Sequence, residues 1–432
     1  MVRDPITALR GREILDSRGR PTVEAEIELA SGLVARASVP SGASTGTLEA
    51  CELRDGDPLR YEGLGTRRAV GNISGTIAAA VVGRDPADQS GLDQLLIELD
   101  GTARKERLGA NATLAVSLAA ARAAAMSAGV LLFQHLAALA GHEGPLQVPL
   151  PMTNLISGGK HAGGQLDIQD VLMVPVGADD YPTALEWIVR VYWRLGHLLR
   201  AAGYEGYLVG DEGGYGPRLS SNEQALEMVV RAVEAAGLAP GEQVTLAVDV
   251  AASHFYREGR YCLRMDGQVR WTSEEMIDAL ARWCQRYPIQ VIEDGLAESD
   301  WSGWKELTAR LGSRRMLVGD DLFVTNPELL GRGIREGVAN AVLIKPNQIG
   351  TLTETLRAVQ LARTHGYAWI VSARSGETED DFLADLAVGV GAAHIKIGSV
   401  ARSERLSKYN RLLRICEALG SSSQRVQSQT AG

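Results

Sequence analysis

Hydrophobic and polar residues alternate along residues 22–39, on both sides of a central Ser-Gly pair. A period of two places the apolar side chains on one face of a strand, so this pattern predicts a two-stranded hairpin with one buried face. Helical periodicity follows over residues 66–83 and again over residues 111–139, where a run of alanines can hide a whole helix surface against its neighbours. These elements predict a separate N-terminal α+β domain over residues 1–140.

The pattern changes after residues 141–151, a proline-containing stretch that is the best candidate for a domain boundary. From there, short apolar runs each precede a helix-like segment. These runs occupy residues 244–250, 289–294, 316–321, 341–347, 368–374 and 393–399. Buried strands that alternate with helices imply a parallel sheet, and a chain of this length closes most readily into a barrel.

We therefore predict a barrel over residues 141–420. An apolar run at residues 170–176, a long helix from about residue 184 to 202 and a Gly-rich segment complete it less regularly. Residues 421–432 lack apolar periodicity, which predicts a disordered tail.

Composition and charge narrow the range of functions. With 45% hydrophobic and 22% charged residues among 432, the chain has the composition of a globular protein. A formal net charge of −9 argues against a nucleic-acid partner, and no apolar run is long enough for a signal peptide or a membrane span. The four cysteines form no CxxC pair. We expect a cytoplasmic protein with reduced thiols and small-molecule partners.

Each predicted barrel strand ends in a charged or polar residue where an apolar one would normally continue. The charged residues that close five of the six strands are Asp249, Glu293, Asp320, Lys345 and Lys396. Because the C-terminal strand ends of a parallel barrel form one mouth, the five side chains are expected to converge on a single cavity. One acidic strand end is ordinarily just solvated or caps a helix, but three in succession favour oxygen ligands for Mg²⁺.

The two lysines and a Gly-flanked glutamate supply acid and base candidates. Lys345 follows an apolar run, so we expect desolvation to lower its pKa and make it a general base. Lys396 would add positive charge for a developing oxyanion. Glu212 lies in the sequence GDEGG, whose glycines allow close approach to a ligand, and it could be the opposing acid, although GDEGG is also good turn chemistry.

Two further segments suit a phosphate group. His161 follows Lys160 in a second Gly-rich loop, where an ordinary surface histidine is the alternative interpretation. Arg374 and Ser375 follow another strand end and offer a guanidinium fork and a hydroxyl. The residues alone therefore predict a Mg²⁺-dependent enzyme that abstracts a proton from a phosphorylated carboxylate.

The chain resembles the enolase family over nearly its whole length. The motifs that carry the resemblance, in the family's order, are REILDSRGRPTVE, VPSGASTG, ELRDGD, LGANA, GDEGG, LAVDVAAS, IEDGLAE, GDDLFVTNP, IKPNQIGTLTET, RSGETED and ARSERLSKYN. The resemblance implies an α/β protein with an N-terminal α+β lid domain and a modified (β/α)8 barrel that starts with an antiparallel strand pair. It also implies a homodimer or an octamer of dimers, and two Mg²⁺ ions in each active site.

The resemblance also implies a role for each matching residue. Asp249, Glu293 and Asp320 would hold one Mg²⁺, and Ser41, in the loop at residues 40–46, would help hold a second. Lys345 would take the C2 proton and Glu212 would be the acid. The residues expected around the substrate are Lys396 at its carboxylate, Arg374 and Ser375 at its phosphate, and His161, Gln169 and Asp170 near the leaving group.

Several positions depart from the family pattern. Ala373 stands where enolases have a histidine, and Asp170 stands where they have a glutamate, one methylene longer. Pro346 replaces the valine of the family's KVNQ, and His254 replaces an acidic residue. The metal ligands and the base are retained, while the surroundings of the substrate's far end are changed.

Three hypotheses remain open from the sequence. The chain is an ordinary glycolytic enolase that converts 2-phosphoglycerate to phosphoenolpyruvate, or it is a pathway-specific relative that accepts an activated phosphonate as second substrate. The precedent for the latter is carboxyphosphonoenolpyruvate synthase of phosphinothricin-type antibiotic biosynthesis. A non-catalytic binding or structural protein is the third hypothesis, and the full set of charged residues disfavours it.

Overall fold

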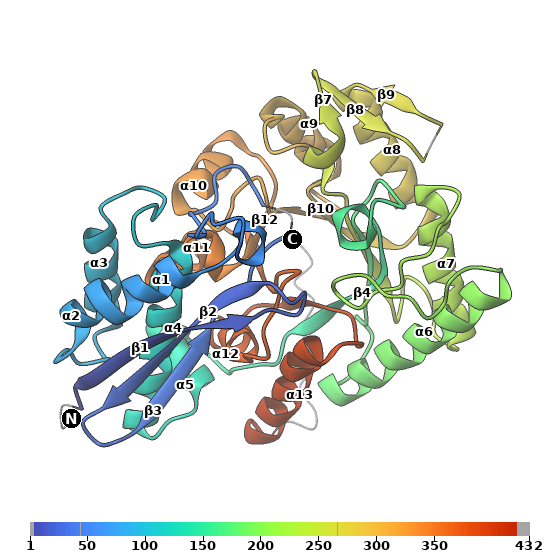
Figure 1. Ribbon diagram of the computed structural model, residues 1–432. Coiled ribbons are helices and arrows are strands. Elements are labelled where there is room, and N and C mark those ends of the chain that lie inside the picture. Colours follow the sequence, from blue (N-terminus) through green and yellow to red (C-terminus); the bar gives the residue numbers. More distant parts are fainter. Residues whose placement is uncertain (1–3, 44, 266, 421–432) are drawn as a thin grey trace.

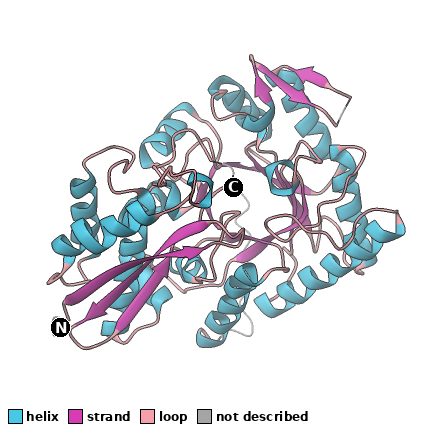
Figure 2. Ribbon diagram, viewed as in Figure 1, coloured by secondary structure: helices cyan, strands magenta, loops and turns pink. Residues whose placement is uncertain are grey.

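The protein, described here as a computed structural model, has a three-stranded sheet with attached helices beside a closed eight-stranded barrel (Figures 1 and 2). The structure describes residues 4–43, 45–265 and 267–420. The predicted tail at residues 421–432 lies outside the described residues. In Figure 1 the blue N-terminal sheet lies to one side of the barrel, and a second small sheet projects from the top.

The N-terminal sheet contains the predicted hairpin. Strands β2 (Pro21–Leu29) and β3 (Val34–Ser38) pair antiparallel, which confirms the prediction for residues 22–39. A third strand, β1 (Ile6–Leu15), pairs antiparallel with β2 and was not predicted. Strand β1 is an edge strand with only two buried positions, so it carries no clear alternation.

The helical predictions for the N-terminal part hold in outline. Residues 67–81 form a continuous helical segment made of α1 (Arg67–Asn72), a π-helical turn (Ile73–Ile77) and α2 (Ala78–Val81). Helix α3 (Gln89–Asp100) was not predicted.

The alanine-rich run at residues 111–139 forms two helices where the pattern predicted one. They are α4 (Ala110–Ala128) and α5 (Leu132–Leu139), bent by 110° with respect to each other. The break occurs at Gly129, whose φ of 66° ends α4 in the left-handed conformation that glycine adopts without strain. No single described helix is long and apolar enough to span a membrane, and only this bent pair, taken together, meets that test.

Helix α4 joins the two parts of the molecule. It packs against β2 and β3 on one side and against α11 (Leu352–Thr364) of the barrel on another, so nearly all of its residues are buried. Small alanine side chains let these elements approach closely from every side.

The barrel closes in the order β10-β11-β12-β13-β14-β4-β5-β6, which confirms the predicted barrel. Its strands are β4 (Leu150–Ser157), β5 (Asp170–Val174), β6 (Thr245–Asp249), β10 (Ile289–Glu293), β11 (Met316–Gly319), β12 (Ala341–Ile344), β13 (Ala368–Ser372) and β14 (His394–Gly398). The resemblance implied one antiparallel strand pair at the start of the barrel, and strand β5 in fact runs antiparallel to both of its neighbours, β4 and β6. The other strand pairs are parallel.

Helices surround the barrel (Figure 1). Besides α11 they are α6 (Tyr181–Ala201), α7 (Asn222–Ala235), α8 (Ser273–Arg286), α9 (Trp301–Leu311), α10 (Pro327–Glu336), α12 (Phe382–Gly389) and α13 (Ser403–Ala418). Helix α6 begins three residues before the predicted start, because the side chain of Asp180 caps the backbone N–H of Thr183 and Pro182 follows in the first turn.

A short antiparallel sheet after β6 was not predicted. It consists of β7 (Tyr256–Arg257), β8 (Arg260–Leu263) and β9 (Val269–Trp271), and it projects from the barrel beside α8 and α9 (Figure 1). Strands of two to four residues are too short to show a period of two in the sequence.

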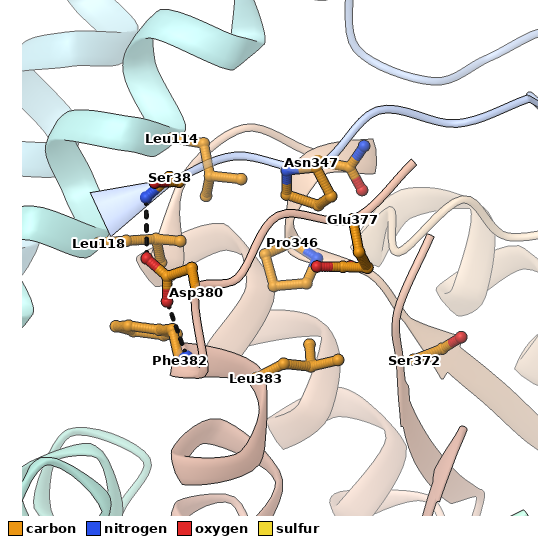
Figure 3. Close-up of a pocket in the computed structure, with 11 residues that line it drawn as sticks. Ser38, Leu114, Leu118, Pro346, Asn347, Ser372, Glu377, Asp380, Phe382 and Leu383 are labelled. Carbon is orange, nitrogen blue, oxygen red and sulfur yellow. Dashed lines mark hydrogen bonds between the residues drawn. The ribbon is translucent and has the colours of Figure 1, made fainter. Parts of the chain in front are cut away.

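A charged contact fastens the N-terminal part to the barrel. The carboxylate of Asp380 accepts hydrogen bonds from the backbone N–H of Ser38 and of Phe382, each at 2.8 Å, beside an apolar cavity lined by Leu114 of α4 (Figure 3). Arg122 of α4 donates to both oxygens of the same carboxylate, at 2.6 and 2.8 Å. Strand β3, helix α4 and the start of α12 therefore meet at one partly buried ion pair.

Candidate active site

The charged strand ends lie at the C-terminal mouth of the barrel. Asp249 and Glu293 are the last residues of β6 and β10, and Asp320 and Lys345 directly follow β11 and β12. Lys396 lies two residues before the end of β14, so it does not close its strand as the pattern suggested. The parallel strands bring these residues together from positions far apart in the chain.

Most of the candidate residues line one cavity. They are His161, Gln169, Glu212, Asp249, Asp320, Lys345, Arg374, Ser375 and Lys396, together with Ser372 and Ala373. Glu293 adjoins the cavity through Lys396, and Asp170 through His161.

Lys396 joins two of the predicted metal ligands. Its Nζ donates to Asp249 Oδ2 at 2.8 Å and to the two carboxylate oxygens of Glu293 at 2.8 and 2.9 Å. Gln169 donates to the same Asp249 oxygen at 3.1 Å. Burial, reinforced by the charge of Asp249, raises the pKa of Glu293 to about 8, so negative charge is crowded at this point.

Lys345 is paired with the third predicted ligand. Its Nζ donates to Asp320 Oδ2, while Gln348 donates to Asp320 Oδ1 at 2.9 Å. Burial alone would lower the pKa of Lys345, but the charge of Asp320 outweighs it and raises that pKa above its usual value. The expectation of a lowered pKa is therefore wrong for this arrangement, because apolar neighbours in the sequence do not reveal a carboxylate on the adjacent strand.

A second group of titratable residues lies at the same cavity as Lys345. His161 Nδ1 lies 2.9 Å from Asp170 Oδ2, and His161 Nε2 lies 3.8 Å from Glu212 Oε1. Burial alone would lower the pKa of His161, but the charges of Asp170 and Glu212 raise it to about 9. Burial raises the pKa of Asp170 to about 6. The charge of Asp170 therefore favours the protonated imidazole of His161, and the shorter side chain of Asp170 does reach His161.

Arg374 is held by a carboxylate from the N-terminal part. Its guanidinium donates to both oxygens of Glu49, at 3.0 and 3.2 Å, and to Asn347 Oδ1 at 3.2 Å. Ser375 Oγ accepts a hydrogen bond from the backbone N–H of Ala43 at 2.8 Å. The described part of the loop at residues 40–46 therefore contacts the predicted phosphate site.

Ser41 lies beside this site, and its side chain is directed elsewhere. Its backbone pairs with that of Gly376 in both directions, at 2.8 and 2.9 Å. Its Oγ donates to Glu52 at 3.1 Å and accepts from Arg54 at 3.0 Å. Ser41 is not among the residues that line the cavity, so its role toward a second metal ion stays a prediction.

Acidic groups that could bind a metal ion lie on both sides of the cavity. Among the described residues, two sets have ligand atoms within 4.8 Å of one another: His161, Asp170 and Glu212, and Asp294, Asp320 and Asp321. Asp294 is already used structurally, because its two oxygens accept the backbone N–H of Asp320 and of Asp321 at 3.0 and 2.9 Å. The predicted ligands Asp249, Glu293 and Asp320 are not one of these sets, since they are turned toward Lys396 and Lys345.

The donor chemistry of the predicted ligands nevertheless fits Mg²⁺. Three buried carboxylates face two ammonium groups in one small space, and carboxylate oxygens are the ligands that a hard divalent cation prefers. A dication would favour the ionised form of Glu293, which burial disfavours.

Three residues that bind the predicted site residues were not predicted from the sequence. Glu49 and Gln348 bind Arg374 and Asp320, and Asn347 binds Arg374. Asn347 and Gln348 lie two and three residues after Lys345, so their place after a strand end was a usable signal. Glu49 is far from the barrel in sequence, and nothing in its surroundings marks it.

The fold and the site define an α/β barrel enzyme whose charged strand ends form a carboxylate–lysine centre under an N-terminal α+β domain. Comparison with protein families agrees. Residues 6–136 match the enolase N-terminal domain, and residues 145–430 match the enolase C-terminal TIM barrel domain. The chain belongs to the enolase family.

Proposed function

We propose that the protein is a Mg²⁺-dependent enzyme that removes the C2 proton of 2-phosphoglycerate or a closely similar phosphorylated carboxylate and then eliminates the C3 hydroxyl. The observation that carries the proposal is that Lys345, His161 and Glu212 line one cavity, with His161 and Glu212 next to each other. Lys345 offers a base and Glu212 an acid, as elimination of water requires.

Each residue has a task in this reaction. Lys345 Nζ takes the proton from C2, and the electron pair of that bond forms the double bond to C3. The bond from C3 to its hydroxyl oxygen breaks, and Glu212, next to His161, supplies the proton with which the oxygen leaves as water. Burial alone would raise the pKa of Glu212, but the charge of His161 lowers it, so Glu212 has to take up a proton before this step. Arg374 and Ser375 hold the phosphate, and Lys396 neutralises the substrate carboxylate.

Asp249, Glu293 and Asp320 would hold the magnesium, and Ser41 would contribute to a second site. The metal would supply positive charge beside the substrate carboxylate, which lowers the energy of removing a proton next to it. Lys345 must lose its proton to act as a base, so its ion pair with Asp320 has to loosen in the reacting complex.

We further propose that the enzyme catalyses a specialised reaction with a second substrate. Ala373 lines the cavity and is 5% exposed, and its methyl group takes up less space than the imidazole that the family pattern has at this position. We propose that this space admits an activated phosphonate, such as a nucleotide-linked phosphonoformate, and that the product is of the carboxyphosphonoenolpyruvate type.

Ordinary glycolytic dehydration of 2-phosphoglycerate is the second candidate. It is favoured by the retention of the three predicted metal ligands, of Lys345, Glu212 and Lys396, and by the contact between Asp170 and His161, which the shorter side chain does not abolish. In that case an ordered water would occupy the space next to Ala373.

One assay separates the two candidates. Phosphoenolpyruvate formation from 2-phosphoglycerate alone, followed at about 240 nm, is expected to be far below the roughly 10² turnovers per second of an efficient enzyme. Addition of the phosphonate is expected to give a new phosphonate product in the ³¹P NMR spectrum. Fast formation of phosphoenolpyruvate without the phosphonate would contradict the specialised reaction and support the glycolytic one.

An Ala373→His variant restores the imidazole of the family pattern and so tests whether its absence determines the reaction. If the missing imidazole limits dehydration, this variant gains rate with 2-phosphoglycerate and loses the phosphonate product. If Ala373→His behaves like the wild type in both assays, residue 373 does not determine which reaction the enzyme catalyses.

A further inference from the structure

Asn154, near the C-terminal end of β4, holds Asp170 in place. The Asn154 side chain is fully buried, and its Nδ2 donates both to Asp170 Oδ1 and to Ser157 Oγ, the latter at 2.9 Å. With one carboxylate oxygen bound to Asn154, the other oxygen of Asp170 is directed to His161 Nδ1. The amide thus determines which way the shortened carboxylate faces.

The amide oxygen of Asn154 shows that the hydrogen bond to Asp170 in turn fixes which way the amide itself is turned. Asn154 Oδ1 accepts no hydrogen bond from the described residues although it is buried, and such atoms are uncommon in folded proteins. Turning the amide over would bring this oxygen against the carboxylate of Asp170, where two acceptors repel each other. The Asn154 side chain therefore keeps its hydrogen bond to Asp170, and its own amide oxygen has no donor among the described residues.

The loop that carries Glu212 rests on the same two residues. A Cβ atom on Gly214 would lie 2.8 Å from both Asn154 Oδ1 and Ser157 Oγ, and one on Gly210 would lie 3.0 Å from Ser157 Cβ. Both distances are shorter than ordinary contacts, so the glycines of GDEGG let the loop settle on Asn154 and Ser157. The two carboxylates of the acid side therefore share one support.

We propose that Asn154, assisted by Ser157, is the positioning residue for the acid side of the site. This inference rests on the proposed elimination. Asn154 touches no reacting atom. It acts through Asp170 on His161 and through the GDEGG loop on Glu212, and so it aligns the group that protonates the departing C3 hydroxyl. The base Lys345 is carried by a different part of the barrel, because β13 and β14 lie between β12 and β4.

The test separates the two halves of the reaction in Asn154→Ala. Exchange of the C2 proton of 2-phosphoglycerate with solvent deuterium, followed by ¹H NMR, reports on the base side. Phosphoenolpyruvate formation over hours, followed by ³¹P NMR, reports on the acid side. We expect the elimination rate to fall roughly 10- to 100-fold while proton exchange stays within about twofold, with little change in KM.

Ser157→Ala is the milder variant, in case Asn154→Ala does not fold. It removes the second acceptor of the Asn154 amide, and a smaller fall in elimination, again without a fall in exchange, is expected. Asn111→Ala is the matched control. It removes another buried amide, which bonds the backbone of Leu53 in the N-terminal part, and it should leave the ratio of elimination to exchange unchanged.

The outcomes distinguish this inference from the proposed function. A wild-type protein that neither exchanges the C2 proton nor eliminates would contradict the proposed function itself. If the wild type does both, and exchange and elimination fall by the same factor in Asn154→Ala and Ser157→Ala, the residues are only structural and the positioning role is refuted. If both variants keep the wild-type rates of elimination and of exchange, the positioning role is refuted as well.

Discussion

The guanidinium of Arg374 and the carboxylate of Glu49 form a two-pronged ion pair, at 3.0 and 3.2 Å, although 325 residues separate them in the chain. Both side chains are buried. The predicted phosphate ligand of the barrel is thus already bound to an anion from the N-terminal part. A substrate phosphate must compete with Glu49 for Arg374 or bind alongside it.

Glu49→Gln is therefore expected to tighten the binding of inorganic phosphate and of 2-phosphoglycerate. The amide keeps hydrogen-bonding capacity but removes the competing negative charge, and a gain of roughly 10-fold in affinity corresponds to about 1.4 kcal/mol. Isothermal titration calorimetry measures both affinities. Glu298→Gln is the control, since Glu298 accepts the backbone N–H of Thr47 near the same loop. Weaker binding in Glu49→Gln would mean that Glu49 orients Arg374 for the phosphate.

Asp320→Asn is expected to weaken Mg²⁺ binding roughly 10-fold or more, because a neutral amide loses one full charge of attraction to a dication. Calorimetric titration with MgCl₂ in the absence of substrate measures the effect directly. Asp278→Asn removes an acidic residue that pairs with Arg310 on the surface and should not change the affinity. An unaltered affinity in Asp320→Asn would exclude this residue as a ligand.

Lys345→Ala is expected to abolish exchange of the C2 proton of 2-phosphoglycerate with solvent while the protein stays folded. A proton acceptor must reach the reacting carbon, and Lys345 is the amine that lies beside Asp320 in the cavity. Proton NMR in D₂O follows the exchange, and circular dichroism checks the fold. Lys305→Ala, on the exposed face of α9, serves as control. Persistent exchange would assign the base to another residue.

Asp380→Asn is expected to destabilise the protein by roughly 1–3 kcal/mol at neutral pH, because it weakens charged hydrogen bonds in a partly buried ion pair. Burial alone would raise the pKa of Asp380, but the charge of Arg122 and the hydrogen bonds hold it below the usual 3.8.

A carboxylate with a lowered pKa stabilises the fold fully above its usual pKa and loses that contribution as the pH falls toward the lowered value. The gap in free energy of unfolding between wild type and Asp380→Asn should therefore shrink as the pH is lowered from about 6 to 3. Urea unfolding at several pH values measures it. Asp381→Asn is the control, because Asp381 also pairs with Arg122 but is 37% exposed and should give a smaller gap. A gap that is independent of pH would show that the charge of Asp380 does not matter.

Local patterns carried much of the fold. The alternation at residues 22–39 and the apolar runs before Asp249, Glu293 and Asp320 were sufficient for the hairpin and the barrel, because each pattern reflects which faces of one element are buried. Once parallel strands are assumed, a charged residue at each strand end must point to the same mouth, so the convergence of these residues followed from the sequence as well.

Tertiary structure decided which of those residues pair. Lys396 binds Asp249 and Glu293 while Lys345 binds Asp320, and this pairing reverses the expected direction of the Lys345 pKa. The contacts of Arg374 with Glu49 and of Asp170 with Asn154 were equally hidden. A hydrophobic pattern reports how far each side chain is buried, whereas the partner of a buried charge depends on which strands and loops the closed barrel brings side by side.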